Sequence, residues 1–396
     1  MNPPSPPQPG CDIAIRNGKI ITCDGADSIA SAIAIHDGRI MAVGSDDEIA
    51  GLATDRTRVI DAGGRAVIPG LIDGHAHMDR EGLKGVFPSL SGCRSVADVL
   101  GRIEALVREV QPGDWVVTMP IGEPPYYFDV PDNLAEKRFP TRAELDRIAP
   151  DNPVYIRPIW GYWRHELPLH SVANSRALDA GGLYPDHPDL PPSVTLETDP
   201  DTGEATGLIL EDSFVPIVEL AFFAMMPRFV HDDRVAGLKA AMAAYNRTGT
   251  TSVFEEHGCS QEVIQAYQAL RREDTQTVRA SLIYSPSWHF LKPDDYPRVL
   301  ESWAGWLGGQ GLGDDWLRVE GLYTEPGISL ENALRARASP YSGWAGFNYD
   351  CGIPEDALVD FLIAAARADI RISTITIDFL DLFKKNRSLM NPNPSN

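Results

Sequence analysis

The segment from Ala66 to Arg80, AVIPGLIDGHAHMDR, constrains this chain more than any other. Apolar residues typical of a buried strand lead into Gly74, and His75 and His77 follow where that strand should end. Residues two apart on a strand point to the same side, so both imidazoles are expected to converge on one point. Convergent imidazoles suit a first-row divalent metal, most simply zinc, with further ligands from elsewhere in the chain. The alternative is a pair of loop histidines without a metal, and the surrounding strand and glycines favour the metal.

Length and charge limit the functions open to the chain. Its 396 residues suffice for two or three domains, or for one barrel with an accessory domain. The formal net charge of -21 opposes binding to nucleic acid and to anionic membranes, because like charges repel. The charge therefore predicts neither a nucleic-acid partner nor a membrane partner, and the sequence is compatible with a homo-oligomer.

The cysteines and the N-terminus indicate the cellular compartment in which the protein is expected. The five cysteines are scattered without paired spacing, which favours a reducing cytosol over a disulfide scaffold. Residues 1–10 are rich in proline, lack the features of a signal peptide and are expected to form a disordered leader. No apolar run is long enough to span a bilayer. We therefore predict a cytoplasmic protein.

Residues 11–65 show short apolar runs separated by turns. Asn17-Gly18 and Asp37-Gly38 each stand between two such runs, and these dipeptides favour the positive φ angles of tight hairpin turns. The pattern predicts a small antiparallel β-domain with a hairpin at each dipeptide.

From residue 66 onward, helical patterns alternate with short apolar strands. Such alternation predicts a parallel sheet. The number of strands, and the histidines at the end of one of them, favour a (β/α)8 barrel over a doubly wound sheet. We expect this barrel over residues 66–383, interrupted by an inserted hairpin at residues 194–211 and followed by an atypical tail at residues 384–396.

Four segments resemble the amidohydrolase superfamily, and within it the amidohydrolase-3 branch that includes N-substituted formamide deformylase-like proteins. The first is the β-rich leader, DIAIRNGKIITCDG with SAIAIHDGRIMAVG, which is similar to half of the family's N-terminal β-sandwich. The second is VIPGLIDGHAHMD, the third is HSVANSRAL at residues 170–178, and the fourth is the hairpin TLETDPDTGEATGLILED. The resemblance therefore implies a metal-dependent hydrolase barrel.

The resemblance also implies a chemistry. Family members hydrolyse amide-type C–N bonds other than peptide bonds, using one or two metal ions. The metal lowers the pKa of a bound water to roughly 7 and so supplies hydroxide at neutral pH. His75 and His77 would be the first two ligands. The family completes the site with a lysine or glutamate from a middle strand, two histidines from later strands and an aspartate from the last.

The chain departs from this pattern in its last third. Where the branch often has its lysine, the sequence has Leu322, Tyr323 and Thr324, and no histidine follows His289. The strands that should carry the late histidine and the aspartate have no counterpart before Asn396. The departure supports a second hypothesis, a truncated and catalytically inactive amidohydrolase-fold fragment with a structural or partner-binding role.

Further candidate residues follow other strands. Glu255, Glu256 and His257 come directly after a strand, where a barrel presents its site. We assign His257 as a metal ligand and the two glutamates as acidic groups that assist catalysis; the alternative is a solvated acidic turn.

The remaining candidates are weaker. His170, Trp160 and Tyr323 are candidates for substrate contact, although aromatic residues often only pack long loops. Asp79 is a candidate to orient a ligating imidazole, with a plain helix-start residue as its alternative. His289 is a further ligand candidate.

Overall fold

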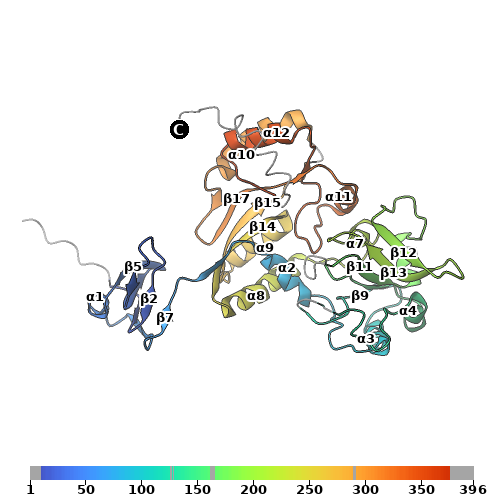
Figure 1. Ribbon diagram of the computed structural model, residues 1–396, viewed down its shortest axis with the longest axis horizontal. Helices are drawn as coiled ribbons and strands as arrows, with labels where there is room; N and C mark the ends of the chain where they lie inside the picture. The colour runs from blue at the N-terminus through green and yellow to red at the C-terminus, as the bar shows by residue number, and fades with distance from the viewer. Residues whose placement is uncertain (1–9, 125–126, 128, 161–165, 289–290, 375–396) are drawn as a thin grey trace, which may run out of the picture. The chain divides into compact units, whose positions relative to one another are not determined.

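The computed structural model describes residues 10–124, 127, 129–160, 166–288 and 291–374 (Figure 1). The chain divides into two compact units, Met1–Leu71 and Ile72–Asn396. Each unit is considered by itself below. The predicted leader and the predicted tail lie outside the described residues, except for Gly10 at the end of the leader.

The first unit, over its described residues, contains two small sheets and one short helix. One sheet has the order β5-β4-β1-β6 and the other the order β3-β2-β7. The strands are β1 (Ile13–Arg16), β2 (Lys19–Ile21), β3 (Ile29–Ala30), β4 (Ala32–His36), β5 (Arg39–Gly44), β6 (Arg58–Asp61) and β7 (Ala66–Val67). Helix α1 (Asp46–Ala50) begins at a capping box, in which Ser45 and Glu48 bond each other's backbone amides. The β-rich character expected for this region is present, and its membership of a sandwich stays a prediction.

Only one of the two predicted hairpin turns forms. At Asp37-Gly38, β4 pairs antiparallel with β5, and the two turn residues have φ angles of 48° and 68°. The prediction at Asn17-Gly18 is wrong, because β1 and β2 belong to different sheets. Asn17 instead donates its side-chain amide to Asp61 and its backbone N–H to Asp46, so the chain passes from one sheet to the other at this point.

The second unit contains a five-stranded sheet with the order β12-β13-β11-β10-β9. Its strands are β9 (Val116–Thr118), β10 (Val154–Ile156), β11 (Leu169–Ala173), β12 (Val194–Thr198) and β13 (Ala205–Glu211). Strands β9 and β10 are parallel, and β12 and β13 form an antiparallel hairpin over the residues where the sequence predicts one. Buried residues of α3 (Val96–Val107) and α4 (Arg142–Ile148) pack against it in one core, and those of α6 (Ser175–Gly181) and α7 (Val218–Ala221) in another.

A second sheet of this unit positions the candidate site. Its order is β16-β17-β15-β14-β8, and β20 pairs with β17. The strands are β8 (Leu71–Asp73), β14 (Thr250–Cys259), β15 (Arg279–Tyr284), β16 (Leu312–Gly313), β17 (Leu317–Tyr323) and β20 (Ile372–Ser373). Strands β14, β15, β17 and β20 run parallel, as the alternating pattern predicts.

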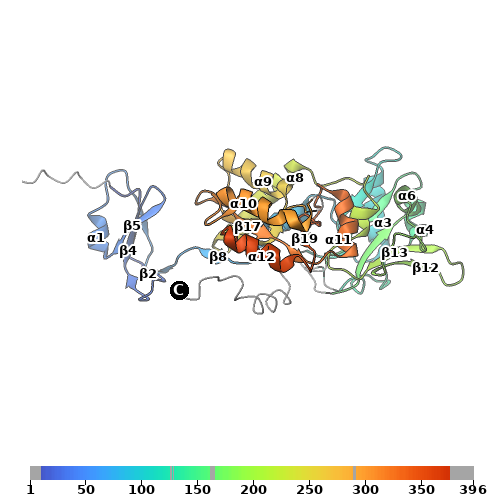
Figure 2. The ribbon, with the colours of Figure 1, turned by 90° about the horizontal axis from the view of Figure 1, so that it is seen from above.

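Helices pack in pairs beside this parallel sheet (Figure 2). Helix α8 (His231–Arg247) packs on α9 (Gln261–Arg272), and their apolar residues form one core with β14 and β15. Helix α10 (Tyr296–Leu307) packs on α12 (Leu358–Arg367) beside β17. The remaining short elements are α2 (Met78–Glu81), η1 (Gly82–Gly85), η2 (Pro293–Asp295), β18 (Glu325–Pro326), α11 (Leu330–Arg335), η3 (Ala336–Ala338) and β19 (Gly352–Ile353).

The strand order of the two sheets in the second unit differs from that of a closed eight-stranded barrel. Strands β9 and β10, which an eight-stranded barrel would place beside β8, are hydrogen-bonded in the five-stranded sheet instead. Across the described ranges the parallel strands form part of a barrel wall, and the closed barrel stays a prediction. None of the described helices is long and apolar enough to cross a membrane. All five cysteines are free.

Candidate metal centre

A short loop after β8 carries the first two candidate ligands. The strand ends at Asp73, whose carboxylate accepts the backbone N–H of His75 at 3.1 Å, and α2 begins directly after His77. Between the two histidines, Ala76 is buried and donates its backbone N–H to the carbonyl of Phe254 at 2.9 Å. The loop is therefore fastened to β14, the strand that carries the other candidates.

Strand β14 contains a bulge where those candidates lie. Glu255 pairs with Leu282 and Cys259 pairs with Tyr284, so one strand has two extra residues. Gly258 sits inside this bulge with φ 76°, and a Cβ added there would lie 2.8 Å from the ring of Tyr323. An irregularity of this kind breaks the alternation of side chains between the two faces.

The bulge places His257 in a cluster of imidazoles. The ring centroid of His77 is 5.1 Å from that of His75 and 5.6 Å from that of His257. Nδ1 of His75 lies 3.5 Å from Oε2 of Glu256, whose other oxygen accepts a hydrogen bond from the hydroxyl of Ser373 at 2.6 Å. Four of the predicted site residues, three imidazoles and one carboxylate, therefore meet here.

Glu255 does not join this cluster. Its Oε1 accepts hydrogen bonds from the hydroxyl of Tyr267 on α9 at 2.6 Å and from the backbone N–H of Asp79 at 3.1 Å. Burial, together with the negative charge of Asp79, raises the pKa of Glu255 to about 8. The two adjacent glutamates, which the sequence groups together, thus have separate surroundings.

Asp79 does not orient an imidazole. It is buried in α2, and its Oδ1 lies 3.6 Å from Nε of Arg80. The expectation that Asp79 accepts a hydrogen bond from a ligating histidine is therefore wrong. Its alternative, a residue of the helix start, describes its position.

Arg80 is the site residue that the sequence analysis missed. Only 1% of it is exposed, and its Nη1 lies 2.8 Å from Nδ1 of His77. Its Nη2 donates to the backbone carbonyls of His257 and Gly258, and its guanidinium lies over the ring of Trp160 at 5.3 Å. The signal for it was available, because residues three apart on a helix are neighbours.

The imidazoles of His77 and His257 are held neutral. Burial lowers the pKa of His77 to about 3, and the positive charge of Arg80 lowers it further. The same two causes, in the same order, lower the pKa of His257. A neutral imidazole is the form that binds a metal ion.

Two of the three predicted substrate-contact residues border the cluster. The ring of Trp160 lies 6.3 Å from that of His77, and the ring of Tyr323 stacks on His257 at 5.2 Å. His170 lies on β11, in the five-stranded sheet, and stacks on Phe139. Its assignment as a substrate contact stays a prediction, and His289 lies outside the described residues.

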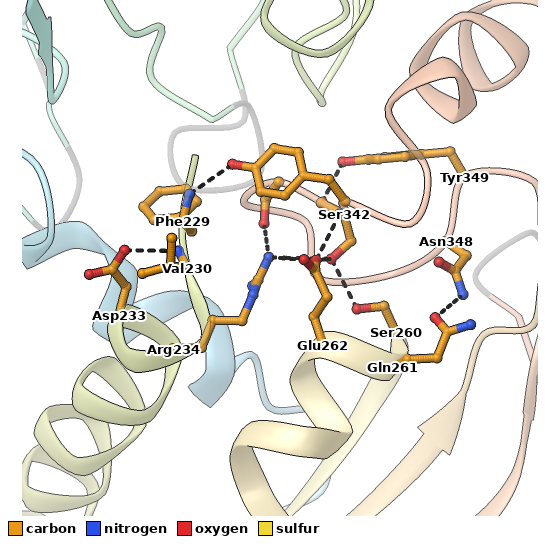
Figure 3. Close-up of polar contacts among 12 residues, drawn as sticks. Phe229, Val230, Asp233, Arg234, Ser260, Gln261, Glu262, Ser342, Asn348 and Tyr349 are labelled. Carbon is orange, nitrogen blue, oxygen red and sulfur yellow. Dashed lines mark hydrogen bonds and ion pairs between the residues drawn. The ribbon is translucent and has the colours of Figure 1, made fainter. Parts of the chain in front are cut away.

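A loop after η3 covers the cluster with an aromatic ring. Phe347, which is buried, places its ring 5.2 Å from that of His257. Figure 3 shows how this loop is fastened: Glu262 on α9 accepts the backbone N–H and the hydroxyl of Ser342, and Arg234 on α8 donates to the same carboxylate at 3.0 Å. The loop is thereby held to two helices that flank β14.

Comparison with known proteins identifies the family. The profile of the amidohydrolase family Amidohydro_3 matches residues 58–376. The chain belongs to this family. It is 32% identical over 206 residues to N-substituted formamide deformylase from Arthrobacter pascens, a match that covers 50% of this chain and 34% of that protein. It is 30% identical over 181 residues to putative amidohydrolase YtcJ from Bacillus subtilis, covering 46% of this chain and 31% of that protein.

The fold has solved relatives as well. An uncharacterized metal-dependent hydrolase from Pyrococcus horikoshii aligns with a TM-score of 0.58 at 20% identity, covering 94% of this chain and 68% of that one. This likeness shows the fold. The matches to the curated amidohydrolases span about a third of the length of those proteins, 34% and 31%.

The family implies a metal, and the residues of the cluster can be tested against it. Three imidazoles and a carboxylate are ligands that zinc accepts, so the donor types fit. Their placement does not close around an ion: in the ranges that the structure describes, no group of three or more His, Cys, Asp and Glu side chains could hold one. The guanidinium beside His77 is the clearest obstacle to a closed ligand set.

Proposed function

We propose that this amidohydrolase-family protein hydrolyses carbon–nitrogen bonds of the amide type, other than peptide bonds, in small molecules with the help of a divalent metal ion, zinc being the simplest choice. The convergence of His75, His77 and His257 beside Glu256 carries the proposal. The deformylase relative supports the choice of an amide-type bond.

The chain's own residues have distinct roles in this proposal. The three imidazoles hold the ion, and Glu256, 3.5 Å from His75, orients that ring or takes up a proton during the reaction. When bound, the metal would lower the pKa of a water to roughly 7 and polarise the scissile carbonyl. Trp160 and Tyr323 form apolar walls beside the imidazoles of His77 and His257. Glu255, which the sequence pairs with Glu256 in catalysis, accepts the backbone N–H of Asp79 at the start of α2, and its catalytic role stays a prediction.

A cavity that the rings of Tyr349 and Phe347 separate from His257 is a candidate to take the body of a substrate. Its volume is about 520 Å³, and Trp288, Tyr296 and Tyr349 are among the residues that line it. The ring of Tyr349 lies 5.0 Å from that of Phe347, which in turn contacts His257. Cavities of this size, with aromatic walls, are typical of small-molecule sites.

A second candidate function is structural. In this alternative the chain keeps the amidohydrolase fold, is catalytically inactive and binds a partner. The observation that favours it is the absence, in the described part of the chain, of three side chains placed to hold an ion. The guanidinium of Arg80 beside His77 also favours this alternative, because a positive charge there opposes the binding of a metal ion.

Metal analysis separates the two candidates. Purified protein, loaded with zinc and then passed through a desalting column, is expected to retain stoichiometric zinc by mass spectrometry and to release formate or ammonia from simple formamides and amides. The double variant His75→Ala/His77→Ala should lose both properties. The control His231→Ala, at an exposed position on α8, should keep both. Wild-type protein that retains no more zinc than the double variant would contradict the metal-dependent proposal.

A further inference from the structure

We propose that Arg80 competes with a metal ion for His77, by fixing the imidazole in the tautomer that carries its proton on Nε2. Arg80 is in this view a positioning residue, and the metal can use His77 only after the guanidinium has moved. The part that concerns the metal rests on the proposed function; the part that concerns the tautomer does not.

The hydrogen bond between the two side chains dictates the tautomer. Nη1 of Arg80 lies 2.8 Å from Nδ1 of His77. A guanidinium stays protonated in proteins and only donates hydrogen bonds, so Nδ1 of His77 must be the acceptor. A neutral imidazole with an accepting Nδ1 carries its proton on Nε2. Neither nitrogen then offers a lone pair to a metal.

This arrangement is the reverse of the usual one around a ligating histidine. Such a histidine commonly binds the metal through one nitrogen and donates its other N–H to a carboxylate or a carbonyl. Here the second nitrogen faces a donor. The carboxylate of Asp79, on the same helix as Arg80, lies 3.6 Å from Nε of Arg80.

The guanidinium is held in place from several sides. Its Nη2 donates to the carbonyls of Gly258 at 3.3 Å and of His257 at 3.5 Å, both within the bulge of β14. Its Cζ lies 5.3 Å from the ring centroid of Trp160 and 6.0 Å from that of Phe347. The hydrogen bonds and cation–π contacts therefore hold the positive charge beside His77 and offset the cost of burying it. That charge also repels a divalent cation, and the repulsion is strong because little water screens it.

Nuclear magnetic resonance tests the tautomer directly in the metal-free wild-type protein. Long-range ¹H–¹⁵N correlation spectra distinguish the two neutral tautomers, and the signals of His77 are assigned as those missing from His77→Gln. We expect the proton on Nε2. A proton on Nδ1 would overturn the proposal.

Metal titration tests the competition. Apo-protein is titrated with Co²⁺, whose visible absorption reports coordination, and then with Zn²⁺ as competitor. Arg80→Met should bind Co²⁺ about tenfold tighter than the wild type or more, the scale on which outer partners of a ligating histidine act. The control Arg157→Met removes another buried cation, whose side chain is paired with Glu219 and lies over aromatic rings, and should leave Co²⁺ affinity unchanged.

The outcomes separate this inference from the proposed function. Stoichiometric Co²⁺ binding by the wild type, with no gain in Arg80→Met, overturns the competition and leaves the proposed function standing. Failure of both proteins to bind overturns the competition and the metal-dependent function together. If Arg80→Met does not fold, as judged by circular dichroism, the tautomer of His77 in the wild type still tests the proposal.

Discussion

The carboxylate of Glu262 accepts two hydrogen bonds from Ser342, from the backbone N–H at 2.9 Å and from the hydroxyl at 2.8 Å. These bonds join positions 80 residues apart in the sequence. They fasten the loop that carries Phe347, whose ring lies against His257, to the start of α9. A single carboxylate thus links the helix layer to the wall of the candidate site.

The first prediction concerns this carboxylate. Glu262→Gln should lower the free energy of unfolding by about 2 kcal/mol, because Arg234 is buried and would lose its charged partner. Urea unfolding followed by circular dichroism measures the change. The control Glu273→Gln breaks an exposed ion pair with Lys239 at the end of the same helix, and should cost less than about 1 kcal/mol. Equal effects of the two substitutions would contradict the assigned role of Glu262.

The second prediction concerns Gly346, in the same loop. Its φ angle is 71°, and a Cβ added there would lie 2.3 Å from Oδ2 of Asp79. Gly346→Ala should therefore destabilise the protein by about 2 kcal/mol or more, because it combines an unfavourable backbone conformation with a steric clash. Thermal unfolding of the wild type and of Gly346→Ala measures this loss of stability.

Gly305 supplies the matched control for that substitution. It lies within α10, and nothing lies within 4 Å of the position of an added Cβ. Gly305→Ala should raise stability by roughly 0.5–1 kcal/mol, because alanine favours a helix more than glycine does. A loss of stability at Gly305 as large as that at Gly346 would contradict the steric argument.

Local signals predicted much of the fold. The positive φ angles that Asp37-Gly38 favours close the hairpin of β4 and β5, and the alternation of helical patterns with apolar runs corresponds to the parallel strands β14, β15 and β17. The pairing of β1 with β4 and β6 overrode the same signal at Asn17-Gly18. A local motif predicts a turn, but it does not decide which strands pair.

The site could be predicted only in part, for a comparable reason. His75 and His77 were recognisable because strand, glycine and spacing lie within one segment. The separate surroundings of Glu255 and Glu256 depend on which groups of α2, α9 and β20 approach β14. The proximity of Arg80 to His257 depends on how α2 packs against β14, across 177 residues of sequence. Pattern reading along one segment does not report such contacts.

The third prediction concerns Asn174, which belongs to the segment that is similar to the family. Its side chain is buried and bonds four backbone groups, accepting from Val154 and Ala177 and donating to Ala149 and Asn152. Asn174→Ala should cost about 3 kcal/mol or more, because several buried groups would lose their partners. Metal content per folded chain should stay unchanged.

His170 provides the contrast within that segment. It stacks on Phe139 and is half-buried, so His170→Ala should cost about 1 kcal/mol in stability. Chemical denaturation of both variants, with zinc analysis of the folded protein, measures the two effects. A loss of zinc in Asn174→Ala at full stability would assign this segment to the site and not to the scaffold.

The fourth prediction is a dependence of stability on pH that arises from Glu211. This residue is buried at the end of β13, and its Oε2 accepts the backbone N–H groups of Ile217 and Val218. Burial raises its pKa from 4.5 to about 7, against the opposing effect of those hydrogen bonds and of Arg335. The folded protein therefore keeps a proton that the unfolded chain has released, over the range from about pH 4.5 to pH 7.

The sign of the effect follows from this difference in bound protons. Glu211 stabilises the fold most below pH 4.5, and its contribution falls as the pH rises through about 7. Glu211→Gln keeps the side chain neutral at every pH, so the free energy of unfolding of the wild type minus that of the variant should fall by on the order of 3 kcal/mol between pH 4.5 and pH 8. Urea unfolding at closely spaced pH values measures this difference, in which the contributions of all other groups cancel. A flat difference for Glu211→Gln would mean that the carboxyl is ionised in the folded protein at pH 5, held by its two backbone donors.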